Sequence, residues 1–233
     1  MPAFEAELLK AVPRTLDISS FRFSNPMDIA YKAGQYLSIT INEGGKALIH
    51  YFSISSSPTE KGYLEFTTRL RDTEFKNALR KLEIGDKVYL KAPFGDFVLK
   101  DATGRIGMLS GGIGIAPLRS MIRYCTDKRL GTKIVLLYGN RSERDIVFKH
   151  ELEDMQRENP NLKVVHTLAE AGEDWKGYRG YIDAAMVKKE IPDYEERVFY
   201  SCGPPAMVEA MEGLLVKMGV KKENIREENF SGY

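Results

Sequence analysis

The segment GGIGIAP at Gly111–Pro117 is the clearest guide to the architecture of the second half of this chain. It follows a short apolar run, RIGMLS, and precedes a helix-like stretch, PLRSMIRYC, so we expect it to join a strand to a helix. Gly111 and Gly112 allow the backbone to approach a phosphate closely, Gly114 keeps the turn tight, and Pro117 suits the first turn of a helix. The free N–H groups and the positive end of the helix dipole attract a pyrophosphate. The segment therefore predicts a nucleotide-binding turn, with a glycine-rich packing turn as the structural alternative.

The rest of the second half alternates apolar runs with helix-like stretches. The further apolar runs are KIVLLY, LKVVHTLA and RVFYSC, and the stretches between and after them include DIVFKHELEDMQRE, VKKEI and PPAMVEAMEGLLVKMG. Strands that alternate with helices of about 10–15 residues are typical of a parallel sheet with helices on both faces. We therefore predict an α/β domain of the nucleotide-binding type.

The first half, from Ala3 to about Leu99, alternates apolar and polar residues over short runs. FEAELLKAV, LDISSFRF, YLSITI, LIHYFSIS, GYLEFTTRL and KVYLKA each suit a strand with one buried face, and Thr73–Leu82 suits a helix that buries Phe75, Leu79 and Leu82. Such strands with one helix fit a small antiparallel β-barrel of Greek-key type. We place the boundary near Asp101–Arg105, which gives a barrel domain at 1–101 and an α/β domain at 102–233.

Composition and charge exclude several classes of protein. The 233 residues carry a formal net charge of +1 and no long basic tract, so we do not expect nucleic acid as the main partner. No apolar run approaches the ~18 residues of a membrane span. The first residues show no signal-peptide pattern, so we expect a cytoplasmic protein. Two cysteines and three scattered histidines suit neither a metal site nor an iron–sulfur cluster, so no metal ligand is expected.

The segment YGNRSER lies at the end of the second predicted strand of the α/β domain, where an adenosine ribose would be recognised. An acidic residue at this place binds a 2′-hydroxyl, whereas arginine accommodates a 2′-phosphate. Asn140, Arg141, Ser142 and Arg144 lie in this segment, which favours NADPH over NADH. The alternative is a solvated loop in which Asp145 is the N-cap of the next helix.

The segment SCGPPAM places a cysteine at the carboxyl end of a predicted strand. Gly203 and Pro204 follow Cys202 and open a helix, at the edge where open sheets bind ligands. The Cys202 sulfur could therefore contact a reactive ring. The structural alternative is a buried cysteine that packs as a small apolar residue.

The segment HYFSISSSP in the barrel half is rich in hydroxyls and aromatic rings. Strand alternation puts Tyr51, Ser53 and Ser55 on one face and His50, Phe52 and Ile54 on the other. Such a strand could offer an aromatic ring to a flat cofactor and a hydroxyl to its polar edge. An ordinary polar strand that runs into a turn is the alternative.

Taken in order, these segments resemble the ferredoxin–NADP⁺ reductase-like superfamily over essentially the whole chain. The matching pieces are AGQY with Gly34-Gln35-Tyr36, HYFSISSSP, EFTTR at Glu65–Arg69, KAPFGDF, GGIGIAP, YGNR, SCGPPAM and the tail EENFSGY. The resemblance implies an antiparallel FAD-binding barrel joined to an NAD(P)-binding parallel-sheet domain. The family's R-x-Y-S motif falls on His50-x-Phe52-Ser53. This implies that Phe52 stacks on the isoalloxazine and that Ser53 lies near flavin N5, the atom that accepts hydride.

One departure from the family concerns the flavin phosphates. The arginine that usually contacts them is His50 here, and a mostly neutral imidazole provides less positive charge than a guanidinium. Arg69, Arg71 and the Thr73 hydroxyl are the expected compensating groups. The family's glycine-plus-serine phosphate motif is not clearly present around Asp72–Asn77, which leaves both FAD and FMN open from the motifs.

The tail Glu228-x-Phe230 matches an E-x-F ending that lies near the nicotinamide site of several members. In plant-type members a terminal tyrosine covers the flavin. The resemblance therefore implies that Phe230 or Tyr233 shields the flavin ring, and a frayed terminus is the structural alternative.

The resemblance supplies a full set of candidate site residues. The catalytic candidates are Ser53, Cys202 and Glu228. The cofactor-binding candidates are His50, Tyr51, Phe52, Ser53, Thr67, Thr68, Arg69, Thr73, Gly111, Gly112, Gly114, Ala116, Pro117, Asn140, Arg141, Ser142, Arg144, Cys202, Gly203, Pro204, Met207, Phe230 and Tyr233.

The implied function is that of an FAD-dependent NAD(P)H oxidoreductase. NADPH or NADH binds along GGIGIAP, a hydride passes to N5 of FAD, and electrons leave to a separate acceptor such as a ferredoxin, a flavodoxin or an oxygenase component. One alternative is an NAD(P)H:flavin reductase that uses flavin as a loosely held substrate. A second alternative is a non-catalytic redox-sensing or regulatory subunit.

Overall fold

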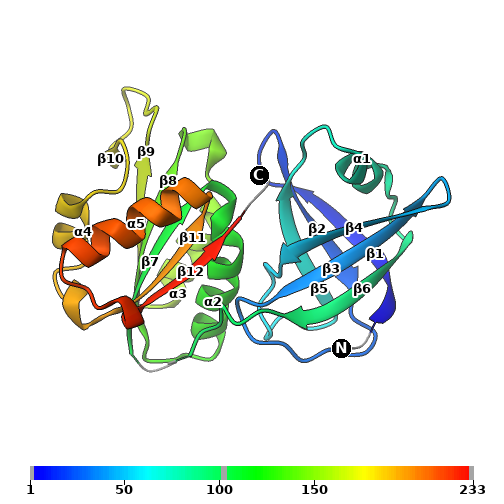
Figure 1. The fold of residues 1–233 in the computed structure, drawn as a ribbon, viewed down its shortest axis with the longest axis horizontal. Coiled ribbons are helices and arrows are strands. Elements are labelled where there is room, and N and C mark those ends of the chain that lie inside the picture. The colour runs from blue at the N-terminus through cyan, green and yellow to red at the C-terminus, as the bar shows by residue number, and fades with distance from the viewer. Residues whose placement is uncertain (1–2, 101–103, 231–233) are drawn as a thin grey trace.

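The computed structural model describes residues 3–100 and 104–230, which form two lobes that lie side by side (Figure 1). The first lobe contains a six-stranded antiparallel sheet and the second a six-stranded parallel sheet. The predicted fold class is therefore confirmed. The predicted boundary between residues 101 and 102 lies outside the described residues. Within those residues, no helix combines the length and apolar character that a membrane span needs.

The strands of the first lobe are β1 (Ala3–Pro13), β2 (Ile18–Ser24), β3 (Tyr36–Glu43), β4 (Lys46–Ser53), β5 (Tyr63–Arg69) and β6 (Lys87–Phe94). They pair in the order β4-β3-β6-β1-β2-β5, and every neighbouring pair is antiparallel. A bridge between Ile54 and Phe66 joins the end of β4 to β5 and closes the sheet into a barrel. Alternate apolar side chains fill the interior, as the period of two in the sequence predicts.

Helix α1 (Glu74–Lys81) covers one end of the barrel, at the top in Figure 1. Thr73 is its N-cap, and the Thr73 hydroxyl accepts a hydrogen bond from the Lys76 N–H at 3.3 Å. Phe75 and Leu79 are buried in the barrel core, and Leu82 packs against that core just beyond the helix. The predicted helix and its apolar face are therefore confirmed.

The strands of the second lobe are β7 (Arg105–Gly111), β8 (Lys133–Asn140), β9 (Leu162–Leu168), β10 (Tyr178–Arg179), β11 (Val198–Gly203) and β12 (Ile225–Asn229). The helices are α2 (Ile115–Asp127), α3 (Lys149–Glu158), α4 (Ala184–Glu190) and α5 (Pro205–Lys217), with short 3₁₀ turns η1 (Gly112–Gly114), η2 (Glu143–Asp145), η3 (Tyr194–Glu196) and η4 (Lys222–Asn224). The strands pair in parallel in the order β10-β9-β8-β7-β11-β12. Helices α2 and α3 pack on one face of the sheet and α4 and α5 on the other, as predicted.

Helix α3 begins later than the sequence predicts. The apolar pattern suggests a helix from Asp145, but Phe148 has a φ of 60°, and the helix starts at Lys149. Asp145 is not the N-cap of that helix. Its carboxylate instead accepts a hydrogen bond from the Ser142 N–H at 3.0 Å and closes the preceding 3₁₀ turn. The left-handed backbone of Phe148 separates the 3₁₀ turn from helix α3. The apolar periodicity of the sequence does not reveal this break.

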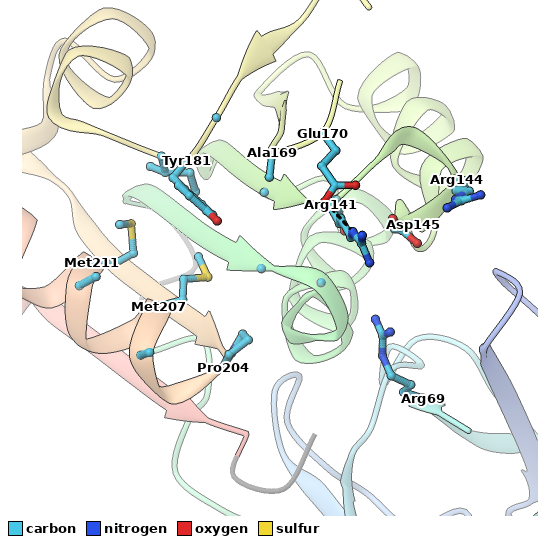
Figure 2. Close-up of a pocket in the computed structure, with 18 of the residues that line it drawn as sticks. Arg69, Arg141, Arg144, Asp145, Ala169, Glu170, Tyr181, Pro204, Met207 and Met211 are labelled. Carbon is cyan, nitrogen blue, oxygen red and sulfur yellow. Dashed lines mark hydrogen bonds and ion pairs between the residues drawn. The ribbon is translucent and has the colours of Figure 1, made fainter. Parts of the chain in front are cut away.

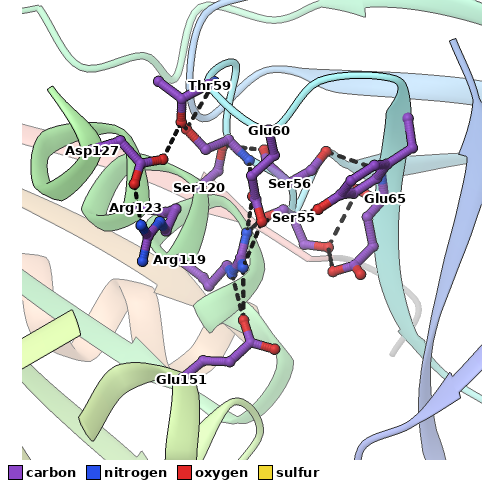
Figure 3. Close-up of polar contacts among 12 residues, drawn as sticks. Ser55, Ser56, Thr59, Glu60, Glu65, Arg119, Ser120, Arg123, Asp127 and Glu151 are labelled. Atoms are coloured by element: carbon purple, nitrogen blue, oxygen red, sulfur yellow. Dashed lines mark hydrogen bonds and ion pairs between the residues drawn. The ribbon is translucent and has the colours of Figure 1, made fainter. Parts of the chain in front are cut away.

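A buried network of charged side chains connects the two lobes (Figure 3). Arg119 of α2 is 5% exposed, and its guanidinium donates to the Ser55 carbonyl at 3.1 Å and to the Glu151 carboxylate at 2.7 Å, and pairs with Glu60. Arg14, from the barrel, also donates to Glu151. Burial alone would raise the pKa of Glu60 and Glu151, but the guanidinium groups hold both pKa values below the ordinary range. These pairings fix how the lobes meet.

Candidate functional site

The predicted nucleotide-binding turn lies where the strand order of the parallel sheet reverses. The chain passes from β7 to β8 on one side of β7, whereas β11 lies on the other side. The turn Gly111–Gly114 after β7 and the dipeptide Gly203-Pro204 after β11 therefore flank a crevice at the carboxyl ends of the strands. Open α/β sheets bind ligands at this kind of position.

A cleft of about 1040 Å³ opens at this crevice. Its volume is at the upper end of the usual ~300–1,000 Å³ range of small-molecule sites. The cleft has one apolar side and one charged side (Figure 2). Pro204, Met207 and Met211 form the apolar side, and the charged side contains Arg141, Arg144, Asp145 and Glu170. Arg69 reaches the same cleft from the barrel.

Close packing against backbone requires glycine at Gly114, whereas a side chain at Gly111 would have to displace the Met207 side chain. A Cβ on Gly114 would lie 2.1 Å from the Cys202 carbonyl oxygen, and one on Gly111 would lie 2.4 Å from the Met207 sulfur. Gly111 and Gly112 line the cleft, whereas Gly114, Ala116 and Pro117 are buried behind it and are absent from its lining. The predicted turn therefore divides into residues that face the cleft and residues that let β7 and β11 approach each other.

The Asn140 side chain lines the cleft and fits a nucleotide. It is 8% exposed, and neither its Nδ2 nor its Oδ1 meets hydrogen-bond geometry with a described residue, although the Tyr138 side chain lies near it. Buried amide groups are normally hydrogen-bonded. An amide in this state suits a ligand that offers both donors and acceptors, as the base and ribose of a nucleotide do.

The predicted ribose-binding segment carries a mixture of charges. The Arg141 Nε lies 2.9 Å from the Glu170 carboxylate, and both side chains are mostly exposed. Arg144 also lines the cleft and makes no ion pair with a described residue. Ser142 does not line the cleft, because its hydroxyl donates to Asp145 at 2.6 Å in the 3₁₀ turn. Arg144 therefore contributes a less neutralised positive charge than Arg141.

Ser53, Glu228 and Cys202 come together from both lobes. The Ser53 hydroxyl, at the end of β4, donates to the Glu228 carboxylate at 3.2 Å. Glu228 on β12 lies in register with Cys202 on β11. Burial raises the pKa of Glu228 to about 7, although the hydrogen bond from Ser53 opposes this. Burial also raises the pKa of the Cys202 thiol well above its ordinary value. We call the place where these three residues of the two lobes meet the seam. The seam thus holds a hydroxyl, a carboxyl that titrates near neutral pH and a neutral thiol. This set of groups suits the polar edge of a flavin ring.

Phe52 does not present the free ring face that the predicted stacking requires. It lies on the inward face of the barrel, is 2% exposed, and stacks on Phe66 at 4.3 Å and on His50 at 4.6 Å between ring centroids. Tyr51 points outward, is 57% exposed and contacts Tyr36 edge-on. The stacking prediction for Phe52 is therefore corrected, because strand alternation turns its ring into the core.

Two threonines predicted to bind cofactor have hydroxyls that are hydrogen-bonded to other side chains inside the barrel. The Thr67 hydroxyl hydrogen-bonds with the Ser20 hydroxyl at 2.7 Å and the Ser55 hydroxyl at 2.9 Å. The Thr68 hydroxyl accepts a hydrogen bond from the Lys76 ammonium. Thr67 is thus a structural residue in this lobe, contrary to the prediction. Thr68 contacts a cation instead of solvent.

The groups expected to replace the positive charge missing at His50 either lie away from His50 or already make a hydrogen bond within the protein. The Arg69 guanidinium donates to the Asp17 carboxylate at 2.6 Å and lines the cleft beside the parallel sheet. The Thr73 hydroxyl caps α1, and Arg71 is exposed. Burial lowers the pKa of His50, and the nearby Lys76 adds to this, so its imidazole is neutral as expected.

The tail lies next to the crevice. The Phe230 N–H donates to the Gly203 carbonyl at 3.0 Å, and its side chain packs against the core of the second lobe. The position predicted for Tyr233 lies outside the described residues. Within the described part of the chain, no group of three or more histidine, cysteine, aspartate or glutamate side chains could hold a metal ion.

Sequence reasoning missed acidic residues that line the cleft, Asp17, Asp145 and Glu170, and the buried lysine of the barrel, Lys76. Glu170 follows the end of β9, so its place at a parallel-strand end was a usable signal. Lys76 gave no signal, because lysine on a short amphipathic helix normally faces solvent, yet here it is 5% exposed.

Two family comparisons cover most of the chain. Residues 6–99 match the family described as an oxidoreductase FAD-binding domain, and residues 108–213 match the one described as an oxidoreductase NAD-binding domain. The two matches correspond to the barrel and to the parallel-sheet lobe.

Longer proteins and a solved structure resemble much or nearly all of the chain. The glycine betaine monooxygenase reductase subunit of Chromohalobacter salexigens is 32% identical over 95% of this chain and 62% of its own length. One subunit of the Na⁺-translocating NADH-quinone reductase of Haemophilus influenzae is 32% identical over 79% of this chain and 49% of its own length. The cytochrome b5 reductase domain of Ulva prolifera nitrate reductase superimposes with a TM-score of 0.87 at 25% identity, over 97% of both chains. The chain thus spans about half to three fifths of the length of these two curated relatives.

Proposed function

The chain belongs to the ferredoxin–NADP⁺ reductase-like superfamily, with an FAD-binding domain followed by an NAD-binding domain, and on this premise we propose that it is an FAD-dependent NAD(P)H oxidoreductase. The proposal includes the transfer of electrons to an acceptor outside these 233 residues. The domain limits 1–101 and 102–233 remain part of the proposal.

The observation that carries the proposal is the meeting of Ser53 with Glu228. These residues are 175 positions apart and belong to different lobes, yet their side chains are joined by a 3.2 Å hydrogen bond. Cys202 lies beside Glu228 on the neighbouring strand. A hydride donor held in the cleft and a flavin held on the barrel would both reach this seam.

We assign the chain's residues the following roles in the reaction. FAD, when bound, would supply the redox chemistry of a hydride acceptor that can release electrons singly. Gly111 and Gly112 bring backbone N–H groups to the nucleotide phosphates, and Asn140 offers both hydrogen-bonding groups of its amide. Ser53 positions the Glu228 carboxyl, which can hold or release a proton near neutral pH. Cys202, neutral and buried, excludes water beside them.

The nucleotide donor is proposed to be NADPH in preference to NADH. Arg141 and Arg144 both line the cleft where a 2′-phosphate would lie. Because Glu170 partly neutralises Arg141, the larger share of the phosphate contact falls to Arg144.

The acceptor is proposed to be a separate electron-transfer protein, such as a ferredoxin, a flavodoxin or an oxygenase component. The name of the Chromohalobacter relative, a monooxygenase reductase subunit, supports an oxygenase component. Two cysteines in the sequence also leave too few thiolates for a four-cysteine iron–sulfur cluster within these residues.

The test of the central proposal is anaerobic stopped-flow mixing of the purified yellow protein with NADPH or NADH. The flavin absorbance is expected to bleach in a single turnover with the preferred nucleotide. Retention of the colour through dialysis would distinguish a bound cofactor from a flavin substrate. A preparation that stays colourless with added FAD, or a yellow one that neither nucleotide bleaches, contradicts the proposal.

The nucleotide preference is tested with Arg141→Ala and Arg144→Ala. Loss of a charge-assisted phosphate contact should weaken NADPH binding by about 10- to 100-fold and leave NADH binding unchanged, with the larger loss for Arg144→Ala. Arg157→Ala, which removes an exposed arginine of α3 outside the cleft, is the matched control. Equal losses for both nucleotides would refute a 2′-phosphate role.

A further inference from the structure

We propose that Tyr138 is a positioning residue of the nucleotide site, which holds the glycine-rich turn in the form that binds the pyrophosphate of the hydride donor. The inference rests on the proposed function, because it concerns the same cleft. Gly112 lines that cleft and Tyr138 does not, so Tyr138 would act through Gly112 and not by touching the nucleotide.

The Tyr138 side chain connects β8 to the turn that follows β7. Tyr138 lies near the end of β8, which pairs with β7, and is 0% exposed. Its hydroxyl donates a hydrogen bond to the Gly112 carbonyl at 2.8 Å. Burial raises the pKa of this hydroxyl, so it keeps its proton and remains a donor at neutral pH. One strand of the sheet therefore holds the turn at the end of its neighbour.

The Gly112 backbone is held by hydrogen bonds and not by packing. Its φ of 53° lies in the left-handed region, which glycine adopts without strain. A Cβ added to Gly112 would have no atom of the described residues within 4 Å beyond its chain neighbours. The Gly112 carbonyl accepts from the Ile115 N–H within the turn and from the Tyr138 hydroxyl outside it. Tyr138 thus restrains a peptide that the surrounding side chains leave free to rotate.

The direction of the Gly112 carbonyl decides where the next N–H points. A trans peptide directs its carbonyl and its N–H to opposite sides. Because the carbonyl is directed to the buried Tyr138, the Ile113 N–H points away from it, toward the cleft that Gly111 and Gly112 line. The first N–H groups of a helix have no partner within it and bind anions. A rotated peptide would instead turn a carbonyl oxygen to the phosphate, and their negative charges would repel each other.

The same hydroxyl also lies near a second residue of the cleft. The Asn140 side chain and the Val147 backbone are beside it. Loss of the hydroxyl could therefore act through Asn140, which lines the cleft where the base and ribose are proposed to lie. Inorganic pyrophosphate separates the two routes, because it has neither a base nor a ribose.

The test is Tyr138→Phe in the flavin-loaded chain, which removes one oxygen atom and keeps the ring and its packing. Flavin bleaching is measured with NADPH, with NADH and with a benzyl dihydronicotinamide, a hydride donor that carries no phosphate. The half-saturating concentrations of both nucleotides should rise about 3- to 10-fold, as for the loss of one neutral hydrogen bond. The maximal bleaching rate and the rate with the phosphate-free donor should stay within about twofold of wild type. The affinity for inorganic pyrophosphate, titrated directly, should fall by the same factor as the nucleotide affinity.

The matched control is Tyr200→Phe. Tyr200 is a buried tyrosine of β11, and its hydroxyl donates to the Val98 carbonyl at 3.2 Å instead of to the turn. This variant should leave the half-saturating concentrations and the pyrophosphate affinity within about twofold of wild type, because Gly112 keeps both of its hydrogen bonds.

Amide hydrogen exchange of the nucleotide-free chain gives a second readout that needs no turnover. The Ile115 N–H should exchange faster in Tyr138→Phe than in wild type or Tyr200→Phe, since the carbonyl that accepts it is less restrained. Unchanged half-saturating concentrations, an unchanged pyrophosphate affinity, or an equal loss of rate with the phosphate-free donor would overturn the positioning role. If none of the three donors bleaches the wild-type flavin, the proposed function fails, whereas the pyrophosphate and exchange measurements still decide the role of Tyr138.

Discussion

At the residue scale, burial changes what the side chains of this protein can do. Glu228 would be a permanently charged carboxylate on a surface, but burial brings its pKa to about 7. Cys202 would be a moderately reactive thiol, but burial raises its pKa and keeps it protonated. Short motifs identify both residues, whereas their chemical states follow from the seam between the lobes. Glu228 is thus the residue of the proposed site that responds to pH near neutrality.

Replacement of Glu228 by glutamine should remove a pH dependence from flavin reduction. A raised pKa means that the group is mostly protonated below pH 7 and ionised above it. An ionised carboxylate places negative charge beside the point that receives a hydride, so wild-type bleaching should slow as pH rises through about 7. Glu228→Gln should give a flat profile over the same range. Stopped-flow bleaching at a series of pH values checks this, and a variant that keeps the wild-type profile would exclude Glu228 as the titrating group.

At the element scale, the turn between β7 and α2 positions the nucleotide site. Gly114 lets this turn pass against the carbonyl of Cys202, which brings the ends of β7 and β11 together. The same contact places the Cys202–Glu228 pair beside the mouth of the cleft. A change in this turn should therefore affect both nucleotide binding and the stability of the second lobe.

Gly114→Ala should destabilise the protein by about 1–3 kcal/mol and weaken nucleotide binding, because its Cβ would overlap with backbone. The control is Gly131→Ala, where no atom lies within 4 Å of the added Cβ. The control should stay within about 0.5 kcal/mol of wild type. Urea unfolding and NADPH titration measure the two effects. Equal stability of the two variants would show that the turn can relax away from Cys202.

At the scale of the whole molecule, the buried network around Arg119 sets the relation between the lobes. Arg119 joins α2 to the barrel and pairs with Glu151 of α3 (Figure 3). Arg14 of the barrel also pairs with Glu151, so this carboxylate is shared between the two arginines. Hydride transfer needs the two ligands to meet at a fixed separation. We therefore expect the network to contribute to the proposed reaction by fixing the relative position of the two lobes.

Arg119→Met should cost about 1–3 kcal/mol of stability, because it removes the guanidinium that pairs with the partly buried Glu60 and Glu151 carboxylates. Arg123→Met, one turn further along α2, removes a half-exposed arginine and should cost no more than about 1 kcal/mol. Urea unfolding compares them. Single-turnover bleaching should also be slower in Arg119→Met than in Arg123→Met at saturating nucleotide. Similar values for both variants would show that the network does not hold the lobes.

Both folds and much of the site could be predicted from the order of the amino acids. A period of two in the first half and alternating strands and helices in the second specify the barrel and the parallel sheet, since these patterns depend on local geometry. The motifs also located Ser53, Cys202, Glu228 and the glycine-rich turn, because strand ends and glycines are visible in a sequence.

The directions and charges of the side chains required the three-dimensional arrangement. Phe52 turns inward to Phe66, and Arg69 reaches the nucleotide cleft instead of the flavin side. Lys76 is a buried lysine whose pKa falls to about 7, which no local pattern indicates, because burial and pKa depend on groups distant in the sequence. The contact between Ser53 and Glu228 likewise exists only because two separate sheets meet at one seam.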